Sequence, residues 1–408
     1  MDERRAVEQP GGRQAMGGAE ESQRLIPLHG FQRVLGTFGE EDEGPLFLIT
    51  AGIHGNERAG VEAVQRVFAA LREAQGTPAG RFKGRCVAFA GNLKGLRAGV
   101  RFIDQDLNRL WTKKGIARLL AGDPSLDDAE EAEARELLGC FEKELGRARG
   151  KVLIMDLHTS SADGPPFSCM GDTIPNRKLA FALPVPVILG LEEAIDGAML
   201  DWFYEQGHVA IAVEGGKHQA RETVDNLEAM IWIALVASGN LHERDLPRLG
   251  DFKRLLEREV RGIPHILEIR YREVIRPGEK FHMIPGFKTF DRIQKGTPLA
   301  EKDGEVLRAT EDGYVLLPLY QGQGEDGFFI GRRVPRFWLL VASLLRRLHA
   351  SRLLPLLPGV RPHPEKKDRF LVDPKIARWG TVQVFHLLGY RRRRPEGDQL
   401  VFSRRPQW

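Results

Sequence analysis

The sequence predicts an α/β fold, built on a mixed, largely parallel sheet that helices cover on both faces. Between about residues 45 and 238, short and continuously apolar runs alternate with segments whose apolar residues recur every three or four positions. The apolar runs are typical of strands buried on both faces of a sheet, and the periodic segments are typical of the helices that cover them. The length of 408 residues leaves room for a second domain and an appendage.

The expected elements follow one another in a regular order. The run PLFLIT at 45–50 predicts the first strand, and the pattern at 58–74 predicts the first helix. Further strands are expected at 85–92, 151–158, 186–190 and 208–216. Further helices are expected at 127–145 and 222–237.

The pattern changes after the last of these helices. From about residue 263 to 333 the predicted strands are short, and the pairs Asp303-Gly304 and Asp312-Gly313 suit tight hairpin turns. We therefore expect four regions: a disordered, polar and Gly-rich segment at 1–24, an α/β catalytic domain at 25–248, an all-β domain at 249–334, and a basic helical and hairpin extension at 335–408.

Charge is distributed unevenly along the chain. From Arg332 to Trp408 there are 18 basic and 5 acidic residues, whereas the rest of the chain is net acidic. We expect the Leu-rich pattern at 336–359 and the basic hairpin pattern at 390–405 to form an accessory packing or oligomerisation element. Its arginines would face acidic protein surface, either on the same chain or on a second subunit of a homo-oligomer. The alternative is that the arginines bind a polyanion such as a nucleic acid or a membrane surface.

Composition also indicates a location. No apolar run reaches the roughly 18 to 20 residues of a transmembrane helix, and the N-terminal residues lack the apolar core of a secretory signal. The three cysteines stand far apart, which suits a reducing compartment and argues against a disulfide framework. We therefore expect a cytoplasmic protein.

A histidine and a carboxylate follow the first predicted strand at once, as His54 and Glu57 in ITAGIHGNERAG. In the turn after a strand, positions i and i+3 lie on one side, at the sheet edge where α/β folds place their sites. The spacing alone is weak evidence, because about one His-x-x-Glu is expected by chance. A second pair, His265 and Glu268, lies in an alternating β pattern that would direct its members to opposite faces.

The run KVLIMDLH strengthens the metal hypothesis, because it ends another buried strand on His158. Asp156 shares the face of His158 and would orient its imidazole. Two histidines and one glutamate are a common ligand set for catalytic zinc and leave a position open for water. His54, Glu57 and His158 therefore predict one Zn²⁺ per chain. Taken singly, each residue would also suit an ordinary polar group at a strand end.

Glu214 ends a further apolar strand, HVAIAVEGG, at the same predicted edge of the sheet. Such a carboxylate near a metal accepts a proton from water and delivers it to a leaving amine, although it would also suit a turn cap. The loop at 91–111 adds Arg101, Asn108 and Arg109. An arginine beside an amide suits a substrate carboxylate, and another arginine near the metal suits an oxyanion. Salt bridges on a surface loop are the alternative.

Four motifs occur in one order: HGNE at 54–57, N-x-x-G-L-R followed by RFIDQDLNR at 101–109, DLH at 156–158, and VEGG at 213–216. This set resembles the succinylglutamate desuccinylase and aspartoacylase family, zinc amidases related in fold to metallocarboxypeptidases, over roughly residues 45–240. The resemblance implies a carboxypeptidase-like fold followed by a β domain. It implies these roles: His54, Glu57 and His158 as zinc ligands, Glu214 as general base, Arg101 as polariser of the substrate carbonyl, and Asn108 and Arg109 as the grip on a substrate carboxylate.

The chain departs from the aspartoacylase pattern at three places. Tyr204 stands where aspartoacylases carry an arginine, about ten residues before the catalytic glutamate, and Thr159 stands where they carry an asparagine. Tyr320 is the nearest residue to their substrate-binding C-terminal tyrosine, without a convincing alignment. The resemblance therefore extends to the amidase chemistry and not to specificity for N-acetylaspartate.

We expect the protein to hydrolyse the amide bond of a small N-acyl amino acid, because a β domain beside the site would restrict access. A carboxypeptidase-like peptidase that acts on a peptide or a cell-wall stem is the first alternative. A binding or regulatory protein that retains the zinc site and uses its basic extension is the second. The intact general base, Glu214, argues against this second alternative.

Overall fold

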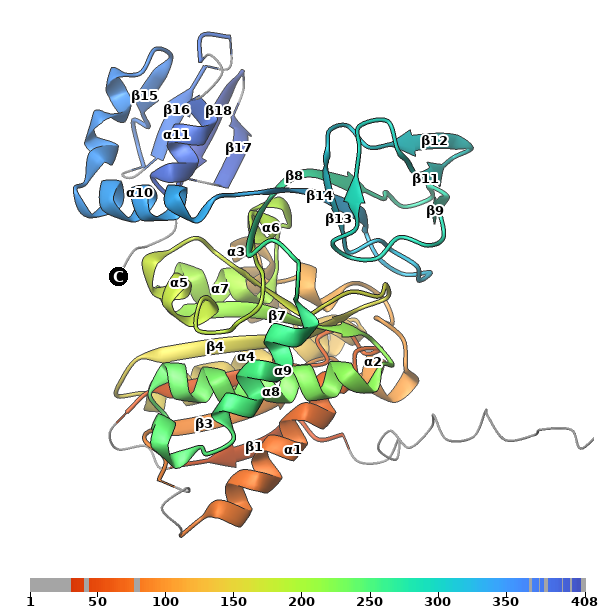
Figure 1. Cartoon of the computed structure of the whole chain (residues 1–408), viewed down its shortest axis with the longest axis vertical. Coiled ribbons are helices and arrows are strands. Elements are labelled where there is room, and N and C mark those ends of the chain that lie inside the picture. Colours follow the sequence, from red (N-terminus) through yellow and green to blue (C-terminus); the bar gives the residue numbers. More distant parts are fainter. Residues whose placement is uncertain are drawn as a thin grey trace, which may run out of the picture.

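The computed structural model describes residues 31–39, 44–76, 81–366, 369–373, 375–377, 381–390, 392–396 and 398–404. The expectation of disorder at 1–24 lies outside the described residues. Figure 1 shows three parts, which we name the α/β body (residues 31–260), the β module (263–334) and the C-terminal unit (335–404). None of the described helices combines the length and the apolar character that a membrane crossing requires.

A single sheet of 11 strands runs through the α/β body and into the β module, in the order β1-β3-β2-β4-β7-β5-β6-β8-β14-β13-β10. Its centre is parallel and consists of β3 (Arg85–Ala90), β2 (Leu46–Ala51), β4 (Val152–Ser160) and β7 (Val209–Lys217). A second parallel group consists of β5 (Phe167–Met170), β6 (Val187–Leu189) and β8 (Ile266–Val274). The predicted mixed, largely parallel sheet is thus confirmed. The antiparallel β1 (Val34–Phe38) and the antiparallel pairing of β5 with β7 were not predicted.

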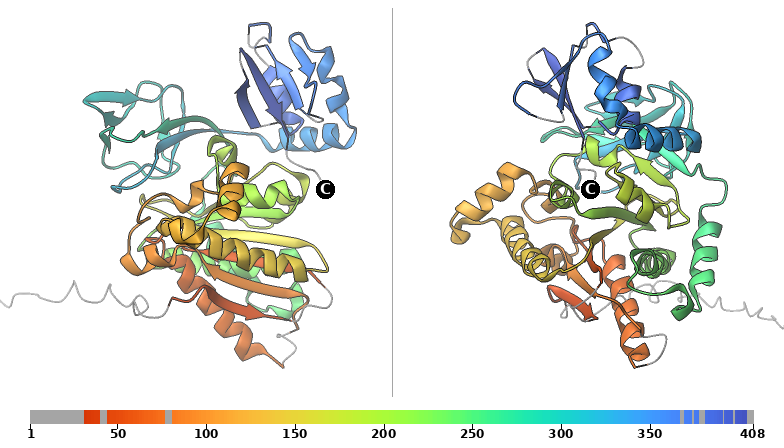
Figure 2. Two further views of the ribbon diagram at one scale, coloured as in Figure 1. Left: turned by 180° about the vertical axis from the view of Figure 1, so that it is seen from behind. Right: turned by 90° about the vertical axis from the view of Figure 1, so that its left-hand side faces the viewer.

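Helices cover both faces of the sheet, as Figures 1 and 2 show. One face packs against α1 (Ala59–Ala74), α5 (Ile174–Ala180), α8 (Arg221–Ser238) and α9 (Leu249–Glu259). The other packs against α3 (Lys113–Ala121), α4 (Ala129–Arg147) and α7 (Met199–Glu205). Shorter helical segments are α2 (Leu93–Ala98), α6 (Leu191–Ala194), η3 (Leu107–Arg109), η4 (Pro124–Leu126) and η5 (Glu243–Asp245).

Alternation along the strands explains why both faces need cover. In β2, Phe47 and Ile49 face the core under α1 and α8, whereas Leu46 and Leu48 face the core under α4 and α7. All six residues of β2 are buried, so a continuous apolar run is what this position in the sheet requires.

The β module extends the large sheet and adds a second one. β8, β14 (Asp326–Arg333), β13 (Gly313–Leu316) and β10 (Arg292–Ile293) pair antiparallel. β12 (Glu305–Arg308), β11 (Pro298–Lys302) and β9 (Phe281–Met283) form the three-stranded sheet, and Asp303-Gly304 forms the predicted turn between β11 and β12. The division into domains stays a prediction, but residues 249–259 form a helix, not the expected β structure. This helix, α9, packs with α8 in the core of the α/β body.

The C-terminal unit has a small core of its own, formed by Phe385, Tyr390 and Phe402 among others. Its elements are α10 (Arg336–Arg347), η6 (Ala350–Leu356), β15 (Val360–Pro362), β16 (Arg369–Val372), α11 (Thr381–Leu387), β17 (Arg392–Glu396) and β18 (Gln399–Ser403). The basic hairpin that the sequence predicts is present as β17 and β18. The pairing of β18 with β16, and of β16 with β15, was not predicted, and it turns the hairpin into a four-stranded sheet.

Candidate active site

The turn after β2 places His54 and Glu57 at the end of the central strands. Gly52 has a left-handed φ of 69°, which lets the chain leave β2 sharply. A Cβ on Gly55 would lie 2.0 Å from the carbonyl carbon of Gly95, so only glycine allows this turn to pack on α2. The N–H of Glu57 donates to the carbonyl oxygen of His54 (3.1 Å), and this turn directs both side chains to one side.

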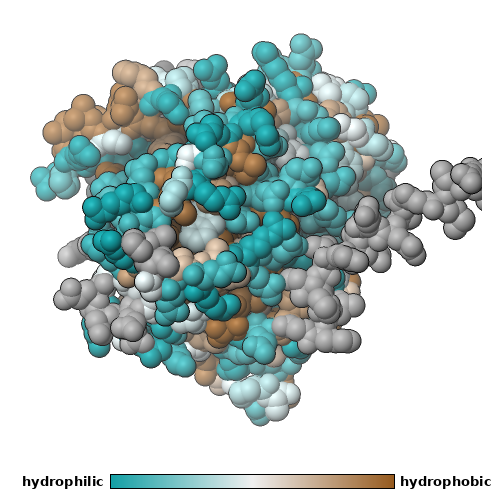
Figure 3. Space-filling model, turned by 60° about the horizontal axis from the view of Figure 1, so that its bottom comes forward, coloured by the Kyte–Doolittle hydropathy of each residue, from teal (hydrophilic) through white to brown (hydrophobic). Residues whose placement is uncertain are grey.

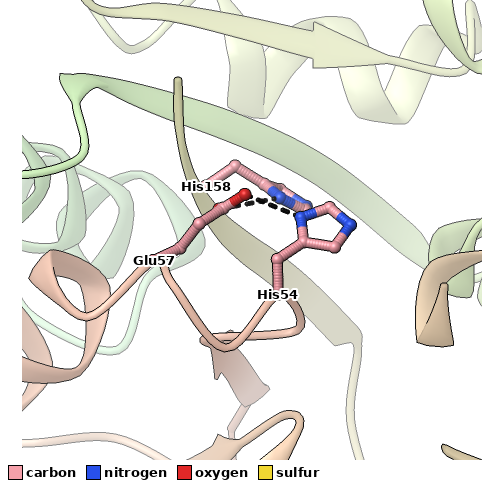
Figure 4. Close-up of side chains that lie close together, drawn as sticks. All are labelled: His54, Glu57 and His158. Carbon is pink, nitrogen blue, oxygen red and sulfur yellow. Dashed lines mark hydrogen bonds and ion pairs between the residues drawn. The ribbon is translucent and has the colours of Figure 1, made fainter. Parts of the chain in front are cut away.

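His158, near the end of β4, meets this pair as the sequence predicts (Figure 4). The Nδ1 atom of His54 lies 2.7 Å from one oxygen of Glu57, and the Nδ1 atom of His158 lies 3.3 Å from the other. Potential ligand atoms of the three residues all lie within 4.8 Å of one another, and all three side chains are buried. The structure therefore brings the three predicted ligands together.

The far nitrogens of both rings are held by aspartates. The Nε2 atom of His158 lies 2.8 Å from Asp156, as predicted, and the Nε2 atom of His54 lies 3.2 Å from Asp106. The Nδ1 atom of each ring is directed at Glu57, and the Nε2 atom of His54 also faces the guanidinium of Arg101 at 2.7 Å. A donor set of two imidazoles and one carboxylate fits a zinc ion, and an aspartate contacts the second nitrogen of each imidazole.

The charges of the cluster favour ionised forms despite burial. Burial opposes the ionisation of Glu57, but His54 and His158 outweigh it and hold the pKa of Glu57 well below its usual value. Burial also disfavours the charged form of His158, but Asp156 and Glu57 outweigh it and raise the pKa of His158 well above its usual value. In the metal-free cluster Glu57 is thus held as a carboxylate and His158 as an imidazolium, so binding of a cation would release the proton of His158.

Glu214 lies beside His158 in the parallel ladder of β4 and β7. Its Oε2 atom is buried and has no hydrogen-bond partner within the part of the chain that the structure describes. Burial, together with the nearby Glu57 and Asp156, raises the pKa of Glu214 to about 8, against the opposing effects of His158 and Arg101. A carboxyl group with such a pKa exchanges its proton near neutral pH.

Arg101 lies at the edge of the cluster. Its Nη2 atom donates to Asp106 (2.9 Å) and lies 2.7 Å from the Nε2 atom of His54, and its Nη1 atom lies 3.8 Å from Glu57. The loop that carries it is held by Glu130 at the start of α4, a buried carboxylate that accepts the backbone N–H groups of residues 103, 104 and 105. Asp104, Asp128 and Glu130 also approach one another, but these bonds give Glu130 a structural role.

Asn108 and Arg109 line the same cavity, and both have partners. The Nη2 atom of Arg109 donates to Asp326 (2.8 Å), its Nε atom to Glu325 (3.2 Å), and its Nη1 atom to the carbonyl oxygen of Asn108 (2.9 Å). The side-chain oxygen of Asn108 accepts the N–H of Met199 (2.7 Å). The carboxylates of Glu325 and Asp326, which the sequence did not lead us to expect, occupy the guanidinium fork.

The cavity that joins these groups has a volume of about 140 Å³. The β module contributes part of its wall, through Leu317, Leu319, Gln321, Glu325 and Phe329 among others. Sequence reasoning missed His218, whose Nδ1 atom lies 2.6 Å from the hydroxyl of Thr159 and whose Nε2 atom lies 3.0 Å from Gln321. His218 follows Glu214 by four residues, which was an available signal. Gln321 had none.

Three residues singled out in the sequence lie outside the cavity lining. The buried hydroxyl of Tyr204 accepts the N–H of Gly171 (2.9 Å) and donates to Ala210 or Glu192. The hydroxyl of Tyr320 donates to the carbonyl oxygen of Ile284 (2.9 Å). Glu268 pairs with His386 (2.9 Å) and does not join a metal cluster with His265 within the described residues.

Comparisons with known proteins agree with this geometry. Residues 43–225 match the model of the succinylglutamate desuccinylase/aspartoacylase catalytic domain. The succinylglutamate desuccinylase of Pseudomonas putida (strain GB-1) is 36% identical over 120 residues, which are 29% of this chain and 32% of that protein. The protein of the same name from Burkholderia pseudomallei (strain 1710b) is 35% identical over 115 residues, 28% of this chain and 30% of that protein. The aligned segment thus spans about a third of the curated relatives' length.

Two solved structures share the fold. The succinylglutamate desuccinylase/aspartoacylase from Rhodobacter sphaeroides superposes with a TM-score of 0.52 at 18% identity, over 73% of this chain and 88% of that one. The ectoine utilization protein EutE (DoeB) from Ruegeria pomeroyi superposes with a TM-score of 0.50 at 20% identity, over 72% of this chain and 87% of that one. The comparisons therefore relate residues 43–225, somewhat less than half of the chain, to the succinylglutamate desuccinylase/aspartoacylase catalytic domain.

Proposed function

We propose that the protein is a zinc-dependent amidohydrolase that removes the acyl group from an N-acyl amino acid. The observation that carries the proposal is that His54, Glu57 and His158 meet Glu214 in one cavity of the family's catalytic domain. The names of the aligned relatives add that they are desuccinylases.

His54 and His158 would hold the zinc ion through their Nδ1 atoms, and Glu57 would hold it through its carboxylate. Asp106 and Asp156 would fix the two rings in this orientation through the Nε2 atoms. When bound, zinc supplies a Lewis acid that polarises a carbonyl group and lowers the pKa of water.

Glu214 would act first as a general base and then as a general acid. It takes one proton from the attacking water, whose oxygen forms the new bond to the carbonyl carbon. It then gives that proton to the nitrogen of the substrate as the C–N bond breaks. The new carboxylic acid loses its own proton to the released amine, so the products are a carboxylate and an ammonium group. The metal-free cavity raises the pKa of Glu214 to about 8, and a zinc ion beside it would lower that pKa, which favours the carboxylate that accepts the first proton.

Arg101 would stabilise the negative charge that develops on the carbonyl oxygen. Its guanidinium is held in place by Asp106 before any substrate arrives, so the transition state requires no reorganisation of this donor.

Arg109 and Asn108 would bind the α-carboxylate of the substrate. The side chain of Glu325 is 53% exposed, whereas Asp326 is largely buried and also accepts a hydrogen bond from Arg272. The incoming carboxylate would therefore replace Glu325 on the fork and leave Asp326 in place. Asn108 fixes its oxygen on the start of α7, which leaves its N–H₂ group to donate.

The wall from the β module supports a small substrate over a peptide or a cell-wall stem. Residues 317–329 close one side of a cavity of about 140 Å³, and the ion pairs from Arg109 to Glu325 and Asp326 tie this wall to the α/β body. A carboxypeptidase-like enzyme would need an open path for the rest of its substrate.

The test is an assay of the zinc-loaded full chain against N-acetyl and N-succinyl amino acids, their carboxyl-amidated forms and short peptides. We expect N-acyl amino acids with a free α-carboxylate to be cleaved fastest, and chelation to abolish cleavage. Faster cleavage of peptides would favour the peptidase. No cleavage by a fully zinc-loaded protein would favour the binding or regulatory alternative.

A further inference from the structure

Helix α10 presents a row of large apolar side chains to solvent. Phe337, Leu340, Leu344 and Leu348 recur at three- and four-residue spacing and are 58–70% exposed. In η6, Leu353 and Leu356 continue the row and are 62% and 79% exposed. The largest hydrophobic area in Figure 3 lies at its upper left, the side on which α10 lies in Figure 1. Apolar residues gathered in this way mark an interaction site more often than scattered ones do.

The opposite face of α10 packs against the protein, and these contacts fix the rotation of the helix about its own axis. Ala342 and Arg346 are buried, and Arg346 pairs with Asp172 of the α/β body at 2.7 Å. Arg177 of α5 donates to the carbonyl oxygen of Leu339 (3.0 Å) and to the hydroxyl of Ser343 (2.8 Å). The apolar row therefore faces outward although the helix is firmly docked.

Positive charge surrounds the row. The sequence from Gly327 to Pro364 contains seven arginines and no Asp or Glu. Six of the seven are exposed and form no ion pair with any carboxylate that the structure describes: Arg332, Arg333, Arg336, Arg347, Arg352 and Arg361.

Two of these arginines, Arg332 and Arg333, line a cavity of about 360 Å³ beside α10, together with Trp338 and Arg270. The carboxylates near it are engaged, since Glu268 pairs with His386 and Glu311 pairs with Arg270. The cavity thus offers exposed guanidinium groups next to the start of the apolar row.

We propose that α10 and η6 form a docking surface for a membrane that contains anionic phospholipids. The apolar row would enter the boundary between head groups and acyl chains, while the unpaired arginines meet the phosphates. A second copy of the chain fits less well, because a two-fold contact would bring the same arginines together with no acidic residue between them. A nucleic acid would leave the leucines in water. The proposal is independent of the activity proposed above.

Co-sedimentation of the full chain with vesicles tests the proposal. We compare pure phosphatidylcholine with phosphatidylcholine that contains about 30% phosphatidylglycerol, at low and at high salt. We expect binding to the anionic vesicles alone, with a steep loss as salt rises. Leu340→Ser/Leu344→Ser should abolish binding, and Arg336→Gln/Arg347→Gln should weaken it by about five-fold per arginine.

The matched controls are Leu126→Ser, an exposed leucine of η4, and Arg261→Gln/Arg292→Gln, two exposed arginines away from α10. These should bind like the unchanged protein. Melting temperature and solution mass are measured for every variant, so that unfolding is recognised. The proposal is overturned if anionic vesicles do not bind the unchanged protein. It is also overturned if the control variants lose as much binding, or if Leu340→Ser/Leu344→Ser splits an oligomer without affecting vesicle binding.

Discussion

His158 on β4 and Glu214 on β7 are direct neighbours in the parallel ladder, and both line the same cavity. One strand therefore carries a proposed metal ligand, and the next carries the group that we propose to move a proton. The pairing register of the sheet sets their separation, so the two roles should be separable by substitution.

Glu214→Gln is expected to keep the zinc content of the protein and to reduce turnover by on the order of a hundred-fold or more, because the amide cannot accept a proton. Zinc analysis and kcat on the best N-acyl amino acid check this. Near-normal turnover by this variant would remove Glu214 from the mechanism.

Asp156→Asn should weaken zinc binding by roughly 10- to 100-fold, because the amide no longer holds the Nε2 atom of His158 as a carboxylate does. The measurement is a competition titration with a zinc chelator. Asp163→Asn, which changes a half-exposed carboxylate, is the matched control. Equal zinc affinity for both variants would contradict the supporting role of Asp156.

Arg109→Lys should raise KM for substrates with a free α-carboxylate, because lysine keeps the charge and loses the planar fork. Carboxyl-amidated substrates, used as the control, should be affected much less. Equal cleavage of the free and amidated forms by the unchanged protein would show that the carboxylate grip is wrong.

Glu325→Gln tests whether Glu325 competes with the substrate carboxylate for the guanidinium of Arg109. Since Glu325 is a half-exposed partner of Arg109, its removal should lower KM for free acids by at most about five-fold, the range expected for an exposed ion pair. The measurement is KM for a free acid and for its amide. A rise in KM would mean that Glu325 helps to bind the substrate.

Arg346→Met should lower the free energy of unfolding by about 1–3 kcal/mol, since Asp172 loses one hydrogen-bonded charged partner and keeps Arg177. Truncation after residue 334 should likewise lower stability, whereas zinc content should not change in either protein. Thermal melting and metal analysis check this. Unchanged melting would mean that the C-terminal unit is not anchored through Arg346.

The sequence predicted the central strands, and the meeting of His54, Glu57 and His158, for the same physical reason. Buried parallel strands are continuously apolar, so a histidine or glutamate at the end of one, such as His158 or Glu214, is conspicuous. The parallel order then brings those ends to one edge of the sheet.

The rest of the site could not be predicted in this way. Gln321, Glu325 and Asp326 reach the cavity through the β module, whose return to the sheet through β14 and β8 depends on long-range packing. The same holds for the C-terminal unit, where the pairing of β16 with β18 joins segments about 30 residues apart. Local patterns show neither contact.

The number of zinc ions bound per chain is the measurement that decides whether His54, Glu57 and His158 form a zinc site. The unchanged protein and Glu214→Gln should each hold one zinc per chain, and His54→Ala/His158→Ala should hold none. Full zinc occupancy in the double variant would contradict the account.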